Sequence, residues 1–313
     1  MNKILITLIT VLLYILFSSW GFYAHKKINQ SAVFLLPTEL AIFYKKNIKE
    51  ITDKAIDADK RCYTDSLEPP RHYIDINEID DNIDSIPIHW SMATEKYTER
   101  KLIAAGIIPW QISRTYQNLV QAFKIKDRNK IIRYSADLGH YIADSHVPLH
   151  TTSNYNGQQT NQIGIHAFWE TRLPEMFAKH YNLFIGTASY VNKPLEAAWE
   201  IVRKSNTMVD SVLTLEKELS QTFRPSDIKA YIERNNQLIL MYSDAYATAY
   251  HDVLNGMVER RFQASVHAVS SYWYSAWIDA GQPKLNSLDS TNGLENEIEA
   301  KEGTKSLGRQ EWH

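Results

Sequence analysis

Residues 138–150 read LGHYIADSHVPLH, so three histidines and an aspartate lie within thirteen residues. His140 and Asp144 are four positions apart and share one face if this segment is a helix. Pro148 would end that helix and turn His150 toward a different point. Imidazole nitrogen and carboxylate oxygen are common zinc ligands, so we expect the chain to fold around a metal site here.

A second pair of the same kind follows in the stretch HAFWE, where His166 and Glu170 are also four positions apart. Together with His150 they make a three-ligand set, and such a set leaves one position open for water. A single pair of this kind is usually an ordinary surface or core pair. Two pairs joined by a histidine beside a proline favour metal binding. His146 lies roughly on the other side of the helix from His140 and is expected to pack or to support a metal ligand from outside the ligand set.

The whole chain has 313 residues, of which 44% are hydrophobic, and a formal net charge of -2. These values are typical of a globular protein of one or two domains. A nucleic-acid substrate would need a local site, because the bulk charge is not basic. Cys62 is the single cysteine, so no internal disulfide can form, and the core or bound metal must stabilise the fold.

The first nineteen residues carry Lys3 and then an apolar run from 4 to 17. This pattern predicts a signal peptide over 1–19 and an exported protein, periplasmic or secreted. An uncleaved N-terminal membrane anchor is the alternative. A helical domain is expected over 20–281, and residues 282–313 are polar and predict a disordered tail.

Helical patterns dominate the chain after residue 20, and strand alternation is scarce, so we predict an all-α fold of one multi-helix domain. Pro37 and Pro109 are expected to start helices, and Asp127 to cap a third. Residues 58–90, with Pro69, Pro70 and Pro87, predict an irregular connection. Further helices are expected at roughly 165–180, 191–218, 226–257 and 260–280. The aromatic last helix is interpreted as core, with membrane contact as an alternative.

The two histidine segments together resemble the trinuclear zinc core of the superfamily that contains bacterial zinc-dependent phospholipase C and the single-strand-specific nucleases of fungi and plants. The resemblance covers roughly residues 20 to 175 and implies a cleft with three Zn²⁺ ions. It implies an N-terminal tryptophan, freed by cleavage after Ser19, as a ligand. It also implies an upstream aspartate and a histidine in the stretch HYID at 72–75. The implied ligands are, for the first ion, Asp57, His72, His140 and Asp144; for the second, His150, His166 and Glu170; and for the third, Trp20, His25 and the bridging Asp144.

The resemblance leaves some positions open. Asp59 is an alternative to Asp57, which is the candidate base or orienter for the attacking water. Arg61 could hold a phosphate oxygen or be a surface arginine. Tyr73 and Asp75 stand where the nucleases stack and hydrogen-bond a base.

The implied activity is a zinc-dependent phosphoric ester hydrolase. We expect a nuclease or 3′-nucleotidase acting on single-stranded nucleic acid or nucleotides, because Tyr73 and Asp75 suit a base. A phospholipase C acting on phospholipid head groups is the alternative, because Glu170 is the residue type of the phospholipases. A non-catalytic zinc protein is the alternative of another class. No obligate protein partner is inferred.

Overall fold

The computed structural model describes residues 22–234, 237–285 and 288. It is mostly helical, with 68% helix and one two-stranded sheet, which confirms the predicted all-α class. The expected signal peptide, Trp20 and most of the expected tail lie outside the described residues.

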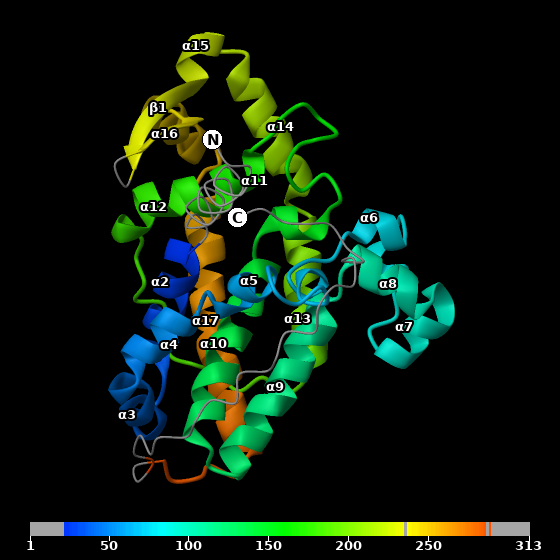
Figure 1. Ribbon diagram of the computed structural model, residues 1–313, viewed down its shortest axis with the longest axis vertical. Coiled ribbons are helices and arrows are strands. Elements are labelled where there is room, and N and C mark those ends of the chain that lie inside the picture. The colour runs from blue at the N-terminus through cyan, green and yellow to red at the C-terminus, as the bar shows by residue number, and fades with distance from the viewer. Residues whose placement is uncertain (1–21, 235–236, 286–287, 289–313) are drawn as a thin grey trace, which may run out of the picture.

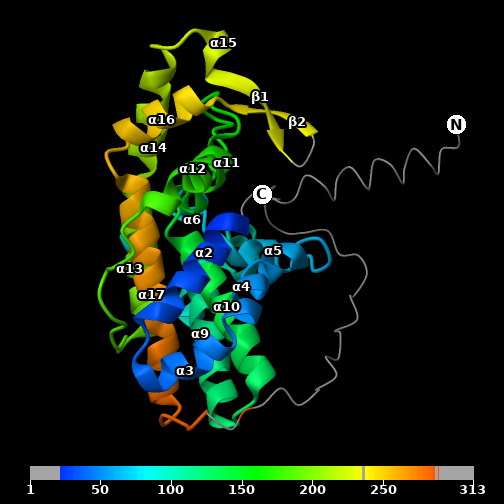
Figure 2. The same cartoon turned by 90° about the vertical axis from the view of Figure 1, so that its left-hand side faces the viewer.

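Four long helices and a shorter one form the body of the molecule. They are α2 (Phe22–Ala32), α9 (Ile108–Lys124), α10 (Arg128–Ser145), α13 (Pro194–Asn206) and α17 (Met257–Asp279). In both views α9, α10, α13 and α17 run along the long axis of the molecule, and α2 packs on α10 and α17 (Figures 1 and 2). Their apolar faces make the core.

Short helices precede α9 in the chain. They are α3 (Thr38–Lys46), α4 (Ile48–Lys54), α5 (Asp57–Arg61), α6 (Ile76–Ile79), α7 (Trp90–Tyr97) and α8 (Glu99–Ala105), with 3₁₀ turns at η1 (Val33–Leu35), η2 (Pro69–Arg71) and η3 (Ile83–Ser85). Among them, α5, η2, α6 and η3 fall in the connection over 58–90 that the sequence analysis expected to be irregular.

The remaining elements follow α10, and most of them lie at one end of the long helices (Figure 2). They are η4 (Pro148–Thr151), α11 (Ile165–Ala167), the π-helical turn η5 (Phe168–Arg172), α12 (Leu173–Phe177), η6 (Ala178–His180), α14 (Val209–Ser220), α15 (Pro225–Ile228), β1 (Lys229–Arg234), β2 (Gln237–Tyr242) and α16 (Asp244–Val253).

The helix expected over 226–257 is wrong for its first half, because β1 and β2 form an antiparallel hairpin there. Four residues of the strands favour β-structure, namely Tyr231, Ile232, Ile239 and Tyr242, and the last of these has a ring partner outside the segment. Tyr242 stacks on Phe168 with ring centroids 3.8 Å apart. The helix expected over 191–218 is also interrupted, between α13 and α14.

Helix α10 begins and ends where the sequence predicts. The Asp127 side chain accepts a hydrogen bond from the Lys130 amide at 3.0 Å, so it caps the first turn as expected. The helix ends at Ser145, before Pro148. At Gly139, α10 meets α2 so closely that a Cβ would overlap the buried Asn29 side chain, whose amide donates to the Ala136 carbonyl at 3.2 Å.

The packed part of the chain continues a little beyond the predicted boundary at 281. Leu285 is buried, and the Trp277 indole donates to the Pro283 carbonyl at 3.0 Å. Among the described residues, no helix is both long and apolar enough to span a membrane.

Gly139→Ala is expected to destabilise the protein by about 1–3 kcal/mol, because the added methyl group overpacks the contact between α10 and α2. In an ordinary helix interior the same change stabilises by about 0.5–1 kcal/mol, so the sign is informative. Urea unfolding of the variant measures it. In an Asn29→Ala background, which removes the overlapping atoms, the loss should shrink. A Gly139→Ala protein more stable than wild type would contradict this account of the packing.

Candidate metal centre

Eight histidine and acidic side chains from separate segments converge in one buried cluster. Helices α2, α5 and α10 contribute to it, as do the residue after η2, the turn η4, and the segment α11–η5. Each of the eight is buried to nine-tenths or more. The members are His25, Asp59, His72, His140, Asp144, His150, His166 and Glu170.

The first group holds four donor atoms. The His140 Nε2 atom lies 3.0 Å from His72 Nδ1, 3.2 Å from Asp59 Oδ1 and 3.2 Å from Asp144 Oδ2. Asp144 Oδ2 is also 3.0 Å from His72 Nδ1. Atoms about 2.0–2.2 Å from one tetrahedral zinc ion lie about 3.3–3.6 Å from one another, so these spacings fit a four-coordinate site to within a few tenths of an ångström.

The second group holds three donor atoms. His150 Nε2 and His166 Nε2 are 3.0 Å apart, and they lie 3.1 and 2.8 Å from Glu170 Oε2. Glu170 lies in the π-helical turn η5, four residues before Pro174. Proline has no amide to donate to the carbonyl of Glu170, which explains why the helix widens at this place. A three-donor group leaves a coordination position for a non-protein ligand.

His25 joins the two groups. Its Nε2 atom lies 3.4 Å from Asp144 Oδ1 and 3.3 Å from Glu170 Oε1. Both oxygens are buried and have no hydrogen-bond partner among the described residues. Buried carboxylate oxygens of this kind need a cation or a proton donor, so the arrangement fits a further ion. Trp20, the other implied ligand of this site, lies outside the described residues.

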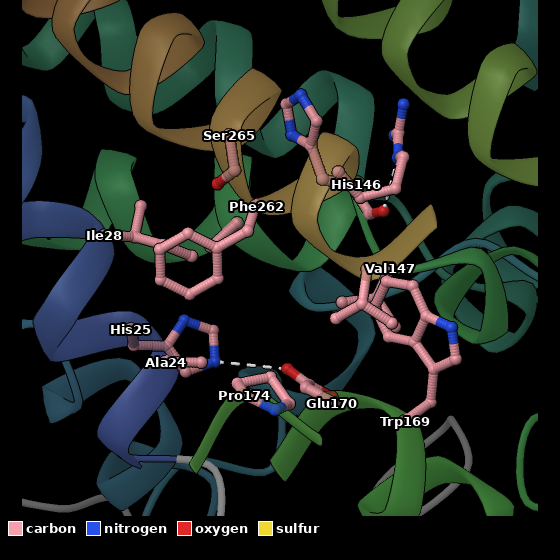
Figure 3. Close-up of a pocket in the computed structure, with 13 residues that line it drawn as sticks. Ala24, His25, Ile28, His146, Val147, Trp169, Glu170, Pro174, Phe262 and Ser265 are labelled. Carbon is pink, nitrogen blue, oxygen red and sulfur yellow. Dashed lines mark hydrogen bonds and ion pairs between the residues drawn. The ribbon is translucent and has the colours of Figure 1, made fainter. Parts of the chain in front are cut away.

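An apolar pocket lies behind His25 and Glu170 (Figure 3). Ile28 and Phe262 line it, and His146 and Ser265 contribute polar atoms. The cavity is about 30 Å³, which is enough for one or two water molecules and far too small for a nucleotide or a lipid. It is therefore too small to be the substrate site.

The charges of the cluster are strongly coupled. Burial alone would lower the pKa of His140, but Asp144 and Asp59 raise that pKa well above its usual value. Burial would raise the pKa of Asp144, but His140, His72 and His25 hold it well below the usual range. Without a metal, the histidines of the first group therefore carry protons that balance the carboxylates.

Backbone carbonyls orient two of the histidines. His140 Nδ1 lies 2.9 Å from the Ala55 carbonyl, and His150 Nδ1 lies 2.7 Å from the His72 carbonyl. A carbonyl only accepts, so these Nδ1 atoms donate, and Nε2 is the nitrogen that faces the cluster and can bind a metal once it carries no proton. This is the usual arrangement around histidine ligands of a metal.

The structure corrects the choice of aspartate. Asp57 is the first residue of α5, is one-third exposed and pairs with Lys60 at 3.0 Å, outside the cluster. Asp59 is two residues further on, about 200° around the helix, and points inward. Asp59, the alternative of the sequence analysis, is therefore the aspartate that lies in the cluster, and Asp57 is not.

The expected substrate contacts also change. Tyr73 is fully buried, and its ring and carbonyl lie against Gly106, so it cannot stack on a base without a rearrangement. Asp75 is also buried, with only 5% of its surface exposed. Arg61 is not a free surface arginine, because its guanidinium pairs with Glu68 at 3.2 Å and with Asp137 at 3.1 Å.

His146 packs away from the cluster, as predicted. Its Nδ1 atom lies 2.7 Å from the Ile142 carbonyl, and burial together with Arg261 holds its pKa well below the usual value.

Sequence reasoning missed Glu68, a fully buried carboxylate four residues before His72. The His-x-x-x-Asp/Glu spacing that revealed the other pairs runs in the opposite direction here, which explains the omission.

No protein-family model matches the chain, and no curated protein matches it. The donor geometry therefore carries the functional argument.

Asp59→Asn should weaken binding of the first zinc ion by at least about 10–100-fold. Loss of a residue that only hydrogen-bonds a metal ligand already costs that much, and Asp59 is expected to be a ligand itself. Asp57→Asn is the matched control and should leave zinc affinity unchanged, because its carboxylate pairs with Lys60. Competition against a chelating dye measures both. Equal losses in the two variants would contradict the assignment of Asp59.

Zinc binding should release protons at neutral pH. The pKa values of His72 and His140 are raised well above 6.5 in the metal-free protein, so at any pH below those values zinc must displace bound protons. Affinity should accordingly fall as the pH falls. Calorimetry in two buffers of different ionisation enthalpy counts the protons. Binding without proton release, and with no dependence on pH, would show that the cluster is not the zinc site.

Proposed function

We propose that this protein is a zinc-dependent phosphoric ester hydrolase with a three-ion centre. The observation that carries the proposal is that the two donor groups and His25 lie together: Asp144 contacts both the first group and His25, and the second group has only three protein donors. Histidine and carboxylate donors in these numbers suit zinc.

Asp59, His72, His140 and Asp144 would hold the first ion, and His150, His166 and Glu170 the second. His25 and Asp144 would hold the third, together with the amine of Trp20. Zinc supplies an activated water near neutral pH and stabilises the charge that builds up on phosphate oxygens. The task of orienting that water, first given to Asp57, would fall to Asp59, whose carboxylate lies in the cluster.

The sequence resemblance to zinc-dependent phospholipase C and the single-strand-specific nucleases supports the same reaction class. The third site needs a free amine at residue 20, so the proposal includes export and cleavage after Ser19. A peptide nitrogen carries a proton and a delocalised lone pair, so it is a poor ligand.

Nucleic acid or nucleotides are the substrate class that the sequence analysis placed first. The burial of Tyr73 removes the stacking argument that favoured them over phospholipid. Phospholipid is the second candidate, and the hairpin favours it. Tyr231, Leu238 and Leu240 are 71%, 70% and 53% exposed, and the pairing of Tyr231 with Leu240 puts them on one face. Exposed apolar side chains beside a hydrolase centre suit a lipid surface.

The hairpin is linked directly to the second group. Tyr242 stacks on Phe168, which lies between His166 and Glu170 in the chain.

A non-catalytic zinc protein is the remaining alternative, and closed four-coordinate sites are typical of that class. The three-donor group argues against it.

A panel assay with zinc-loaded protein distinguishes these candidate functions. The protein should begin at Trp20, as verified by intact mass, and the substrates are single-stranded DNA, RNA, 3′-AMP and phosphatidylcholine vesicles. Hydrolysis of at least one ester is expected, together with its loss on chelation and recovery with zinc. A Tyr231→Ser/Leu238→Ser/Leu240→Ser variant should lose activity on vesicles but keep activity on soluble esters if phospholipid is the substrate. No hydrolysis by fully zinc-loaded protein would favour the non-catalytic alternative.

A further inference from the structure

The histidines of the first group are oriented in different ways. His140 presents Nε2 to the cluster and gives its other nitrogen to a backbone carbonyl. His72 is reversed: its Nδ1 atom lies 3.0 Å from Asp144 Oδ2 and from His140 Nε2. For Nδ1 to offer a lone pair to a metal, the ring proton must be on Nε2. A group next to His72 Nε2, on the side of the ring away from the cluster, must therefore favour a proton on that nitrogen.

Glu68 is the anionic group on that side. Its Oε1 atom lies 3.6 Å from His72 Nε2, and its side chain has no solvent exposure. Cys62 Sγ lies 3.5 Å from the same nitrogen, and its thiol is 3.7 Å from the Ala58 carbonyl, to which it can donate. A carboxylate can only accept from Nε2–H, whereas a thiol can either donate or accept.

The carboxylate of Glu68 is held in place from several directions. Arg61 contacts Oε1 at 3.2 Å, Arg71 contacts Oε2, and the Tyr141 hydroxyl donates to Oε1. Burying a carboxylate is costly unless charged or hydrogen-bonding partners compensate, and here two guanidinium groups and a phenol do so. The contacts also give Arg61 a role: it helps to keep Glu68 ionised and fixed.

The local backbone fixes the distance between Glu68 and His72. The turn η2 (Pro69–Arg71) lies between them, and its two prolines restrict the backbone. The Arg71 amide donates to the Glu68 carbonyl at 2.9 Å, and the His72 amide donates to the Pro69 carbonyl at 3.1 Å. The Pro-Pro pair is thus a rigid spacer between the carboxylate and the ring it faces.

We propose that Glu68, held by Arg61, Arg71 and Tyr141, is a positioning residue that fixes the Nε2–H tautomer of His72 and so makes its Nδ1 atom a metal ligand. The proposal rests on the zinc site of the proposed function. Partners of this kind fix the ring and raise the basicity of the ligand, and their loss typically costs 10–100-fold in metal affinity.

Zinc affinity of four proteins tests the proposal: wild type, Glu68→Gln, Asp137→Asn and Cys62→Ala. Asp137→Asn is the matched control, because Asp137 is a buried carboxylate that pairs with the same Arg61. Competition against a chelating dye with zinc alone should show an affinity about 10–100-fold lower for Glu68→Gln. The other two variants should bind as wild type does. Loss in Cys62→Ala with wild-type affinity in Glu68→Gln would overturn the proposal in favour of the thiol.

Long-range ¹H–¹⁵N spectra of zinc-loaded wild type give a readout that needs no variant to fold. His72 should carry its proton on Nε2, and a proton on Nδ1 would overturn the proposal. The zinc site and the role of Glu68 can fail separately. If wild type binds no zinc, the proposed function fails. If wild type binds zinc and Glu68→Gln binds it equally well, only the role of Glu68 fails.

Discussion

The fold depends on the compensation of charge in a desolvated space. Three carboxylates, Asp59, Asp144 and Glu170, are buried together with five imidazoles. Each carboxylate would cost several kcal/mol to bury alone, and mutual repulsion would add to that cost. The group is tolerable only because cations lie between the oxygens, either as protons on histidine or as metal ions. Helices α2, α5, α10 and α11 are thereby tied to one point.

The elements around the cluster serve its geometry. Gly139 lets α2 approach α10, so His25 reaches the oxygens of Asp144. Pro174 widens the helix at Glu170, and Pro148 ends α10 so that His150 can turn toward His166. These are local features of the backbone with direct consequences for where donor atoms lie. Changes at these positions would therefore act on metal binding at a distance of several residues.

The sequence predicted this cluster unevenly, for physical reasons. Pairs four apart on one helix share a face, so His140 with Asp144 and His166 with Glu170 could be read directly. The choice between Asp57 and Asp59 could not be made from the sequence, because spacing does not encode where a five-residue helix starts or which of its faces points inward.

The burial of Tyr73 depends on its contact with Gly106, thirty-three residues away in sequence, which periodicity does not reveal. The β1–β2 hairpin was missed for a similar reason. Its register and its stacking on Phe168 are tertiary contacts, whereas the helical expectation used local pattern alone. The all-α class itself followed from pattern over long segments, where local signals add up.

The central claim is that protein atoms in this cluster coordinate metal ions. Anomalous diffraction at the zinc absorption edge, from crystals of the protein with a free amine at Trp20, tests this most directly. The account predicts three anomalous peaks. One should lie among Asp59, His72, His140 and Asp144, one among His150, His166 and Glu170, and one beside His25. Density in which these histidines and carboxylates contact one another directly, with no anomalous peak among them after equilibration with zinc, would contradict it.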